Sequence, residues 1–118
     1  MALAADESTE TGFLIEAANL LKSARPTAVN LNWAVDFMLK RLKGMEPDRR
    51  RKAAWHLAAE ICEQERTMSI RLAKHAQTII EALYLKLGRP LNILTHCNAG
   101  KLATVELGTA TAGIYTAF

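Results

Sequence analysis

Apolar residues recur at helical spacing over most of the chain. Over residues 8 to 23 they fall close to the i, i+3, i+4, i+7 pattern of a helix with one buried face. Pro26 ends this predicted helix, because proline disfavours helical geometry at the residue before it, Arg25. The apolar face of the helix is made of Phe13, Leu14, Ala17, Ala18, Leu20 and Leu21.

A second helix is predicted to begin near Asn30, a residue type that caps helix N-termini, and to end at Gly44. Its main apolar stripe is accompanied by a second one that contains Trp33 and Phe37. Because this helix has two apolar faces, we expect it to pack between two neighbours.

A third helical region is predicted from about Pro47 to Lys86, with a possible break near Arg66 and Thr67. Its apolar stripe includes Cys62, which is expected to be a small core residue. Gly and Pro at residues 88 to 90 end the helical pattern.

Residues 91 to 95 form a short apolar run between turn signals, which is typical of a buried strand. Such a strand needs neighbouring strands to bond its N–H and C=O groups, and the rest of the chain offers no second convincing strand. A last helix over residues 108 to 118 would run directly into the chain end. The predicted fold is therefore mainly α with one buried strand, and the chain stops within a larger fold.

The charge pattern gives little sign of a nucleic-acid partner. The chain carries 15 basic and 12 acidic residues, a formal charge of +3. Its dense basic run, residues 49 to 52, contains no aromatic residue, whereas nucleic-acid surfaces often place aromatics among their cations. A solvated helix start is favoured over a phosphate-binding patch, and no nucleic-acid partner is expected.

Two cysteines, Cys62 and Cys97, lie far apart and show no metal-ligand spacing. Neither a disulfide framework nor a metal site is indicated, and a reducing cytoplasm is the simplest interpretation. No run of about 18 apolar residues is present, and the first residues lack the cationic start of a signal peptide. We expect a soluble cytoplasmic protein without a membrane partner.

The sequence His96-Cys97-Asn98-Ala99-Gly100 is the first candidate for chemistry. It follows the predicted strand, and in open α/β sheets ligands bind beyond the carboxyl ends of strands. A thiol there can donate a proton or act as a nucleophile, and small residues let backbone amides approach an anion. A buried thiol followed by a tight turn fits the local pattern equally well. Neighbours on a strand point to opposite faces, so His96 and Cys97 need not form a pair.

Arg25 is the second candidate. It lies between Ala24 and Pro26, beside a rigid bend and just before a new helix, where a guanidinium can bind a phosphate through two hydrogen bonds. From the residues alone, an exposed loop arginine is the simpler interpretation.

Two segments carry a resemblance to a known family. ARPTAVNLNWAVDFM (24–38) and NILTHCNAGKLATVELGTATAGIY (92–115) closely resemble S-methyl-5-thioribose-1-phosphate isomerases of methionine salvage. The resemblance implies an aldose-ketose isomerase that needs no cofactor, acts on a phosphorylated methylthiopentose and forms a homodimer. It also implies that Cys97 is the active-site cysteine, that Arg25 holds the substrate phosphate, and that Asn98 and Gly100 bind substrate.

The chain also departs from the family. Members are much longer, and this chain lacks their upstream Arg-Gly-Ala-Pro loop and their downstream acid/base aspartate, for which Glu106 is no match. The resemblance therefore implies an internal piece. Residues 1–88 would be the later part of a helical N-terminal domain, and residues 89–118 the first strand, active-site loop and helix of a Rossmann-like domain. We expect this piece to be inactive by itself.

Three alternatives remain open. Ribose-1,5-bisphosphate isomerases share the fold and the cysteine, although the Asn-Ala-Gly continuation and the Gly-Thr-Ala segment fit the methylthioribose enzymes better. Regulatory subunits of a translation-initiation exchange factor are binding modules of related sequence, disfavoured by the enzyme-like setting of Cys97. A natural short paralogue could act as an interaction domain only.

Overall fold

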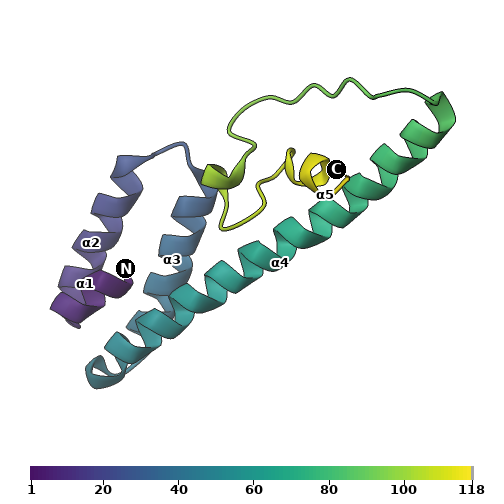
Figure 1. Cartoon of the computed structure of the whole chain (residues 1–118). Coiled ribbons are helices and arrows are strands. Elements are labelled where there is room, and N and C mark those ends of the chain that lie inside the picture. Colours follow the sequence, from purple (N-terminus) through teal and green to yellow (C-terminus); the bar gives the residue numbers. More distant parts are fainter. Residues whose placement is uncertain (118) are drawn as a thin grey trace. The chain divides into compact units, whose positions relative to one another are not determined.

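The computed structural model describes residues 1–117, apart from the side chain of Ala103, and consists of helices joined by turns and irregular segments (Figure 1). This confirms the mainly α prediction. The chain divides into two compact units, Met1–Ile61 and the residues from Cys62 onward, and the division lies within α4. The helices are α1 (Ala2–Glu7), α2 (Thr11–Ala24), α3 (Val29–Lys43), α4 (Pro47–Leu87) and α5 (Ala112–Ala117), with a short 3-10 helix, η1 (Lys101–Ala103).

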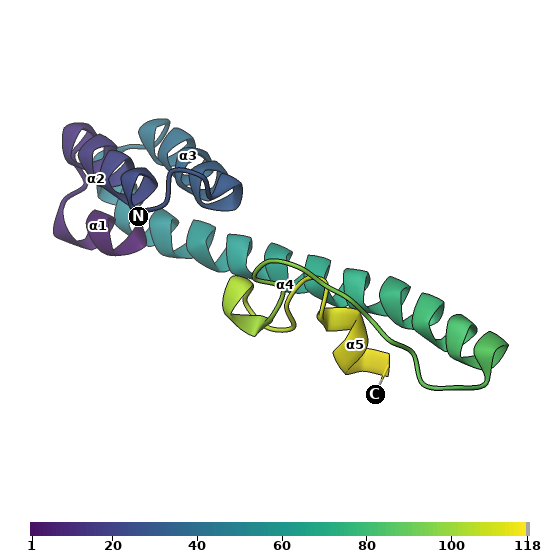
Figure 2. The ribbon, with the colours of Figure 1, turned by 90° about the horizontal axis from the view of Figure 1, so that it is seen from above.

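The core of the first unit collects apolar side chains from α1, α2, α3 and the first turns of α4. Leu14 of α2 and Leu42 of α3 are completely buried in it. Figure 2 shows α2 and α3 side by side, with α1 next to α2. The amphipathic stripes of the sequence predict this core in part, because Leu14 is buried whereas Leu20, on the same predicted face, is 73% exposed. Its buried members are Ala5, Leu14, Met38, Leu42, Ala54 and Leu57.

The start of α3 differs from the sequence prediction. The N-cap residue is Ala28, which provides no side-chain cap, and Asn30 lies inside the helix, so the Asn30 cap is wrong. Instead, the Asn32 side chain donates a hydrogen bond to the Pro26 carbonyl at 3.2 Å. Asn32 therefore ties the helix start to the preceding turn from inside the helix. Gly44 is the C-cap, as predicted.

The basic run at the start of α4 is not simply a solvated surface. Arg50 is buried, with 6% of its surface exposed. Its guanidinium donates to the carbonyls of Met45 and Thr9 and to the hydroxyl of Thr11, at 3.0, 2.8 and 2.8 Å. Arg51 donates to the Asp6 carbonyl at 2.6 Å. Half of the run therefore fastens the N-terminal helices to α4.

Helix α4 is continuous from Pro47 to Leu87, so the possible break at Arg66 and Thr67 does not form. Cys62 is exposed on this helix, and its assignment to the core is wrong. The helix ends where sequence analysis places it, because Gly88 adopts a φ of +62° and donates its N–H to the Tyr84 carbonyl at 2.9 Å.

In the second unit α5 packs against α4. A Cβ added at Gly113 would collide with Ala76, so the two helices approach each other closely at this point. The Thr116 hydroxyl lies 3.3 Å from the Ala73 carbonyl of α4, to which it donates. The helix predicted over residues 108–118 is thus shorter, Ala112–Ala117, and Phe118 lies outside the described residues.

The buried strand predicted over Leu91–Thr95 is absent from the described part of the chain. Figure 1 shows the segment after α4 as an extended run without strand arrows. Leu94 is 97% exposed there rather than buried. A strand forms only where another strand accepts and donates its backbone hydrogen bonds, and no second strand occurs among residues 1–117.

Candidate functional site

Cys97 lies in a strained turn of the second unit. Its φ is +73°, in the left-handed region that non-glycine residues rarely adopt. The Cys97 carbonyl accepts a hydrogen bond from the Ala99 N–H at 3.0 Å, which closes a three-residue turn. The thiol is exposed. Backbone strain often occurs at functional sites, so this exposed thiol is a candidate reactive group.

The Ala99 carbonyl anchors this turn. Ala99 is 6% exposed, and its carbonyl oxygen accepts the Thr111 hydroxyl at 2.7 Å. The same oxygen accepts the N–H groups of Thr109 and Thr111 at 2.9 and 3.4 Å. One buried oxygen therefore joins the cysteine turn to the segment that leads into α5.

Gly108 allows the cysteine turn and the segment before α5 to lie close together. Its φ is +91°, and a Cβ built on it would lie 2.6 Å from the Ala99 oxygen and 2.9 Å from the Thr111 hydroxyl. Its N–H donates to the Thr104 hydroxyl at 2.8 Å. A side chain at residue 108 would push the two segments apart.

Asn98 and Gly100 lie within two residues of Ala99, so the structure brings them together with Cys97 in one turn. Asn98 is exposed, and Gly100 is half-buried immediately before η1. Lys101 follows, with its ammonium 5.7 Å from the centre of the Tyr115 ring. The turn therefore offers a thiol, an amide and a cation close together in sequence.

Glu106 is occupied elsewhere on the second unit. Its carboxylate accepts a 2.7 Å hydrogen bond from the Arg66 guanidinium of α4. This bond and the neighbouring charge raise the pKa of Arg66 above its ordinary value. Glu106 is thus an ion-pair partner on the surface rather than a free acid or base.

Arg25 belongs to the first unit, whereas Cys97 belongs to the second. It is the C-cap residue of α2 and is exposed, and its carbonyl accepts the Ala28 N–H at 3.0 Å. An ion pair at 2.8 Å between Lys22 and Asp36 joins the end of α2 to α3 nearby. The Arg25 guanidinium is therefore presented to solvent from a short, hydrogen-bonded turn.

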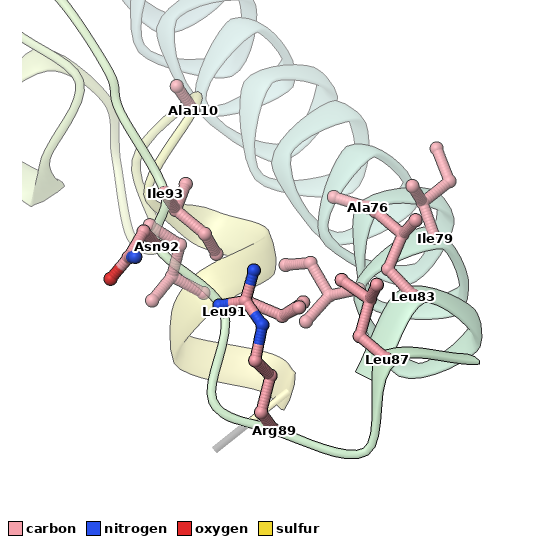
Figure 3. A pocket seen from close by; sticks show the side chains of 11 residues that line it. Ala76, Ile79, Leu83, Leu87, Arg89, Leu91, Asn92, Ile93 and Ala110 are labelled. Atoms are coloured by element: carbon pink, nitrogen blue, oxygen red, sulfur yellow. The ribbon is translucent and has the colours of Figure 1, made fainter. Parts of the chain in front are cut away.

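The second unit also contains a cavity of about 450 Å³ between the end of α4, the irregular segment after it and α5. Figure 3 shows Arg89 at this cavity among apolar side chains such as Leu83 and Leu91. Cys97, Asn98 and Gly100 do not line it. Such an apolar lining suits hydrocarbon better than a phosphorylated sugar.

Two kinds of structure are absent from the described residues. No helix there is both long and apolar enough to cross a bilayer. No group of three or more His, Cys, Asp or Glu side chains is placed to hold a metal ion in that part of the chain.

Comparison with known proteins identifies the family. The profile of the Initiation factor 2 subunit family matches residues 4–117. The chain belongs to this family. Several similar curated proteins are named methylthioribose-1-phosphate isomerase, which confirms the resemblance found in the sequence.

Three of these relatives illustrate the similarity. The protein of Paramagnetospirillum magneticum is 45% identical over 118 residues, which is 100% of this chain and 33% of the relative. The protein of Rhodospirillum rubrum is 42% identical, covering 96% of this chain and 30% of the relative. The protein of Escherichia coli O45:K1 is 46% identical, covering 84% of this chain and 27% of the relative. The chain thus spans about a third of the length of these relatives.

Sequence reasoning missed Gly108 and Thr111, which hold the Ala99 carbonyl. The available signal was the segment Gly108-Thr109-Ala110-Thr111, where small residues and hydroxyls alternate directly before a helix. Small residues at such a position indicate close backbone approach, and hydroxyls there commonly bond to backbone.

Proposed function

We propose that this chain is part of a sugar-phosphate isomerase that converts S-methyl-5-thioribose 1-phosphate into S-methyl-5-thioribulose 1-phosphate. The observation that carries the proposal is 45% identity over all 118 residues to a protein named methylthioribose-1-phosphate isomerase. The alignment extends through both candidate segments, around Arg25 and around Cys97, because it covers the whole chain.

The proposed reaction relocates two hydrogens and leaves the atom count unchanged. The hydrogen on the second sugar carbon passes to the first carbon, and the ring C–O bond at the first carbon breaks. The second carbon becomes a ketone as its hydroxyl loses a proton, and the freed ring oxygen takes up a proton. Cys97 assists this transfer as the proton donor or acceptor, or by supporting a hydride shift. Its exposed position on a hydrogen-bonded turn supports that role.

The substrate contacts follow from the same proposal. Arg25 binds the phosphate, because a guanidinium pairs with phosphate oxygens through two parallel hydrogen bonds. Asn98 and Gly100 contact the sugar phosphate next to the thiol. Exposure of Arg25 and Asn98 supports these roles, since both side chains are available to a ligand.

The surrounding fold is proposed from the family resemblance. In the longer protein, residues 91–95 form a buried strand at the start of a Rossmann-like domain that begins at residue 89, and residues 1–88 belong to the helical domain. The extended, exposed apolar residues Ile93 and Leu94 support this, because an apolar run of this kind suits the interior of a sheet. The longer protein is a cytoplasmic homodimer.

This chain alone is proposed to be inactive. It spans about a third of its relatives, and the carboxylate of Glu106 is held by Arg66. Removing the acid/base group costs about 10² to 10⁴ in rate, and loss of phosphate contacts reduces substrate binding as well.

The test compares the protein expressed from its native gene with this chain, using S-methyl-5-thioribose 1-phosphate. We expect a longer native product that is active, and an inert 118-residue chain. Cys97→Ser in the native product should lower kcat at least about 100-fold, whereas Cys62→Ser, which alters the other exposed thiol, should not.

Other outcomes contradict the proposal in different ways. Turnover of ribose 1,5-bisphosphate with none of the methylthioribose substrate would favour the second sugar phosphate. A native product that is well folded, binds another protein and turns over neither substrate would favour a regulatory binding module.

A further inference from the structure

We propose that Thr111 is a positioning residue for Cys97, acting through the Ala99 carbonyl. The inference rests on the proposed function, because it gives Thr111 a part in a reaction that Cys97 assists. Thr111 does not touch the substrate in this proposal.

The first step is the link from Thr111 to the cysteine turn. The Thr111 hydroxyl donates to the buried Ala99 carbonyl at 2.7 Å, the shortest of three hydrogen bonds to that oxygen. The Ala99 N–H in turn donates to the Cys97 carbonyl at 3.0 Å. Hydrogen bonds made by the N–H and the carbonyl of one residue, Ala99, therefore connect Thr111 to the residue that carries the thiol.

The second step is the link from Thr111 to a rigid element. The Thr111 carbonyl accepts the N–H groups of Ile114 and Tyr115, both at 3.1 Å, so the residue is built into the first turn of α5. That helix is docked on α4 through the contact of Gly113 with Ala76. A hydroxyl fixed at this helix start holds the cysteine turn better than a free loop would.

The third step is the strain at Cys97. A cysteine with a φ of +73° needs surrounding contacts to keep it in the left-handed region. The hydrogen bonds at Ala99 supply such contacts next to it. When the Thr111 hydroxyl is removed, the Ala99 carbonyl oxygen keeps only two donors, the N–H groups of Thr109 and Thr111. The Thr111 N–H is the weaker of these, because it lies 3.4 Å from the oxygen. The turn can then relax, and the thiol moves away from its productive position.

The test uses Thr111→Val, which removes the hydroxyl but keeps the shape, and Thr111→Ser, which keeps the hydroxyl. In the protein expressed from its native gene, Thr111→Val should lower kcat about 10- to 100-fold and leave KM within about twofold, because misplacement of a reacting group affects the transition state most. Thr111→Ser should restore most of kcat.

A matched control is Thr78→Val. The Thr78 hydroxyl also donates to a backbone carbonyl, that of Lys74 at 3.1 Å, but on the exposed side of α4. Its replacement should leave kcat unchanged.

Amide hydrogen exchange of the same variants provides a second readout that needs no substrate. The N–H groups of Ala99 and Thr109 should exchange faster in Thr111→Val than in Thr111→Ser or Thr78→Val. Wild-type exchange and wild-type kcat in Thr111→Val would overturn the proposal, as would equal losses in Thr111→Val and Thr111→Ser. If Cys97→Ser remained active, the proposed function would fail, while exchange would still show whether Thr111 holds the turn.

Discussion

At the scale of single residues, the side chain and the backbone of Cys97 are in different situations. The thiol is exposed, whereas the backbone is held in a conformation that costs a non-glycine residue roughly 1–2 kcal/mol. The side chain is therefore free to react while the turn determines where it does so.

This backbone strain can be measured with two variants that both lack the thiol. Cys97→Gly should unfold at a higher denaturant concentration than Cys97→Ala, by about 1 kcal/mol in stability, because glycine adopts a φ of +73° without a steric penalty. Equal stabilities would show that the left-handed conformation is not strained in solution. Neither variant should be active in the native gene product.

Arg50 allows a second prediction at this scale. Its buried guanidinium donates to Met45, Thr9 and Thr11, so Arg50→Met should destabilise the protein by about 2–4 kcal/mol in urea unfolding. The exposed neighbour provides the control, since Arg49→Met should change stability by less than about 0.5 kcal/mol. Similar losses in both variants would contradict the assigned role of Arg50.

At the scale of elements, two helical glycines have opposite surroundings. Gly12 in α2 has no atom near a built Cβ, whereas a Cβ at Gly113 in α5 would collide with Ala76. The same substitution should therefore change stability in opposite directions.

Gly12→Ala should stabilise the protein by about 0.5–1 kcal/mol, because alanine loses less backbone entropy in a helix. Gly113→Ala should destabilise it by about 1–3 kcal/mol and increase amide exchange in α5, because the added methyl group forces α5 away from α4. Denaturant unfolding and exchange measure both. Stabilisation by Gly113→Ala would show that the helices do not approach as closely as described.

The elements also show how far sequence reasoning extends. Helices α2, α3 and α4 were predictable because their apolar stripes repeat with helical period, and the ends at Gly44 and Gly88 carry local signals. The strand over residues 91–95 was not, since strand formation depends on partners that local sequence does not contain. Cys62 was misassigned because periodicity shows which residues share a face, but not which part of a long helix has a neighbour.

The candidate site was likewise predictable from the sequence only in part. Cys97, Asn98, Gly100 and Arg25 came from local motifs and a family resemblance, and their roles remain predictions. The contacts of Arg50 with Thr9 and of Ala99 with Thr111 are long-range or backbone contacts, and no residue pattern identifies the partner in advance.

At the scale of the whole molecule, much apolar surface is uncovered in the second unit. Leu85 and Leu94 are 80% and 97% exposed, and Tyr84 and Leu87 are also exposed. Large apolar side chains exposed to this extent commonly mark a place where other protein packs.

We therefore expect this chain to bind a hydrophobic dye and to associate with itself as its concentration rises. Leu85→Lys together with Leu94→Lys should reduce both effects, as measured by dye fluorescence and sedimentation. The control is Leu3→Lys, which changes an exposed leucine of the first unit. A monomeric wild-type chain without dye binding would contradict the expectation.

The Ala99 carbonyl has a consequence for how sequences of this family can vary. A backbone carbonyl is present whichever amino acid occupies residue 99. Selection for the hydrogen bonds to this carbonyl therefore requires only that residue 99 is small. It acts instead at Gly108, which must lack a side chain, and at Thr111, which must supply a hydroxyl. In a library of random variants selected for activity, position 111 should therefore accept serine and threonine alone, and position 108 only glycine, while position 99 accepts any small residue that keeps its N–H.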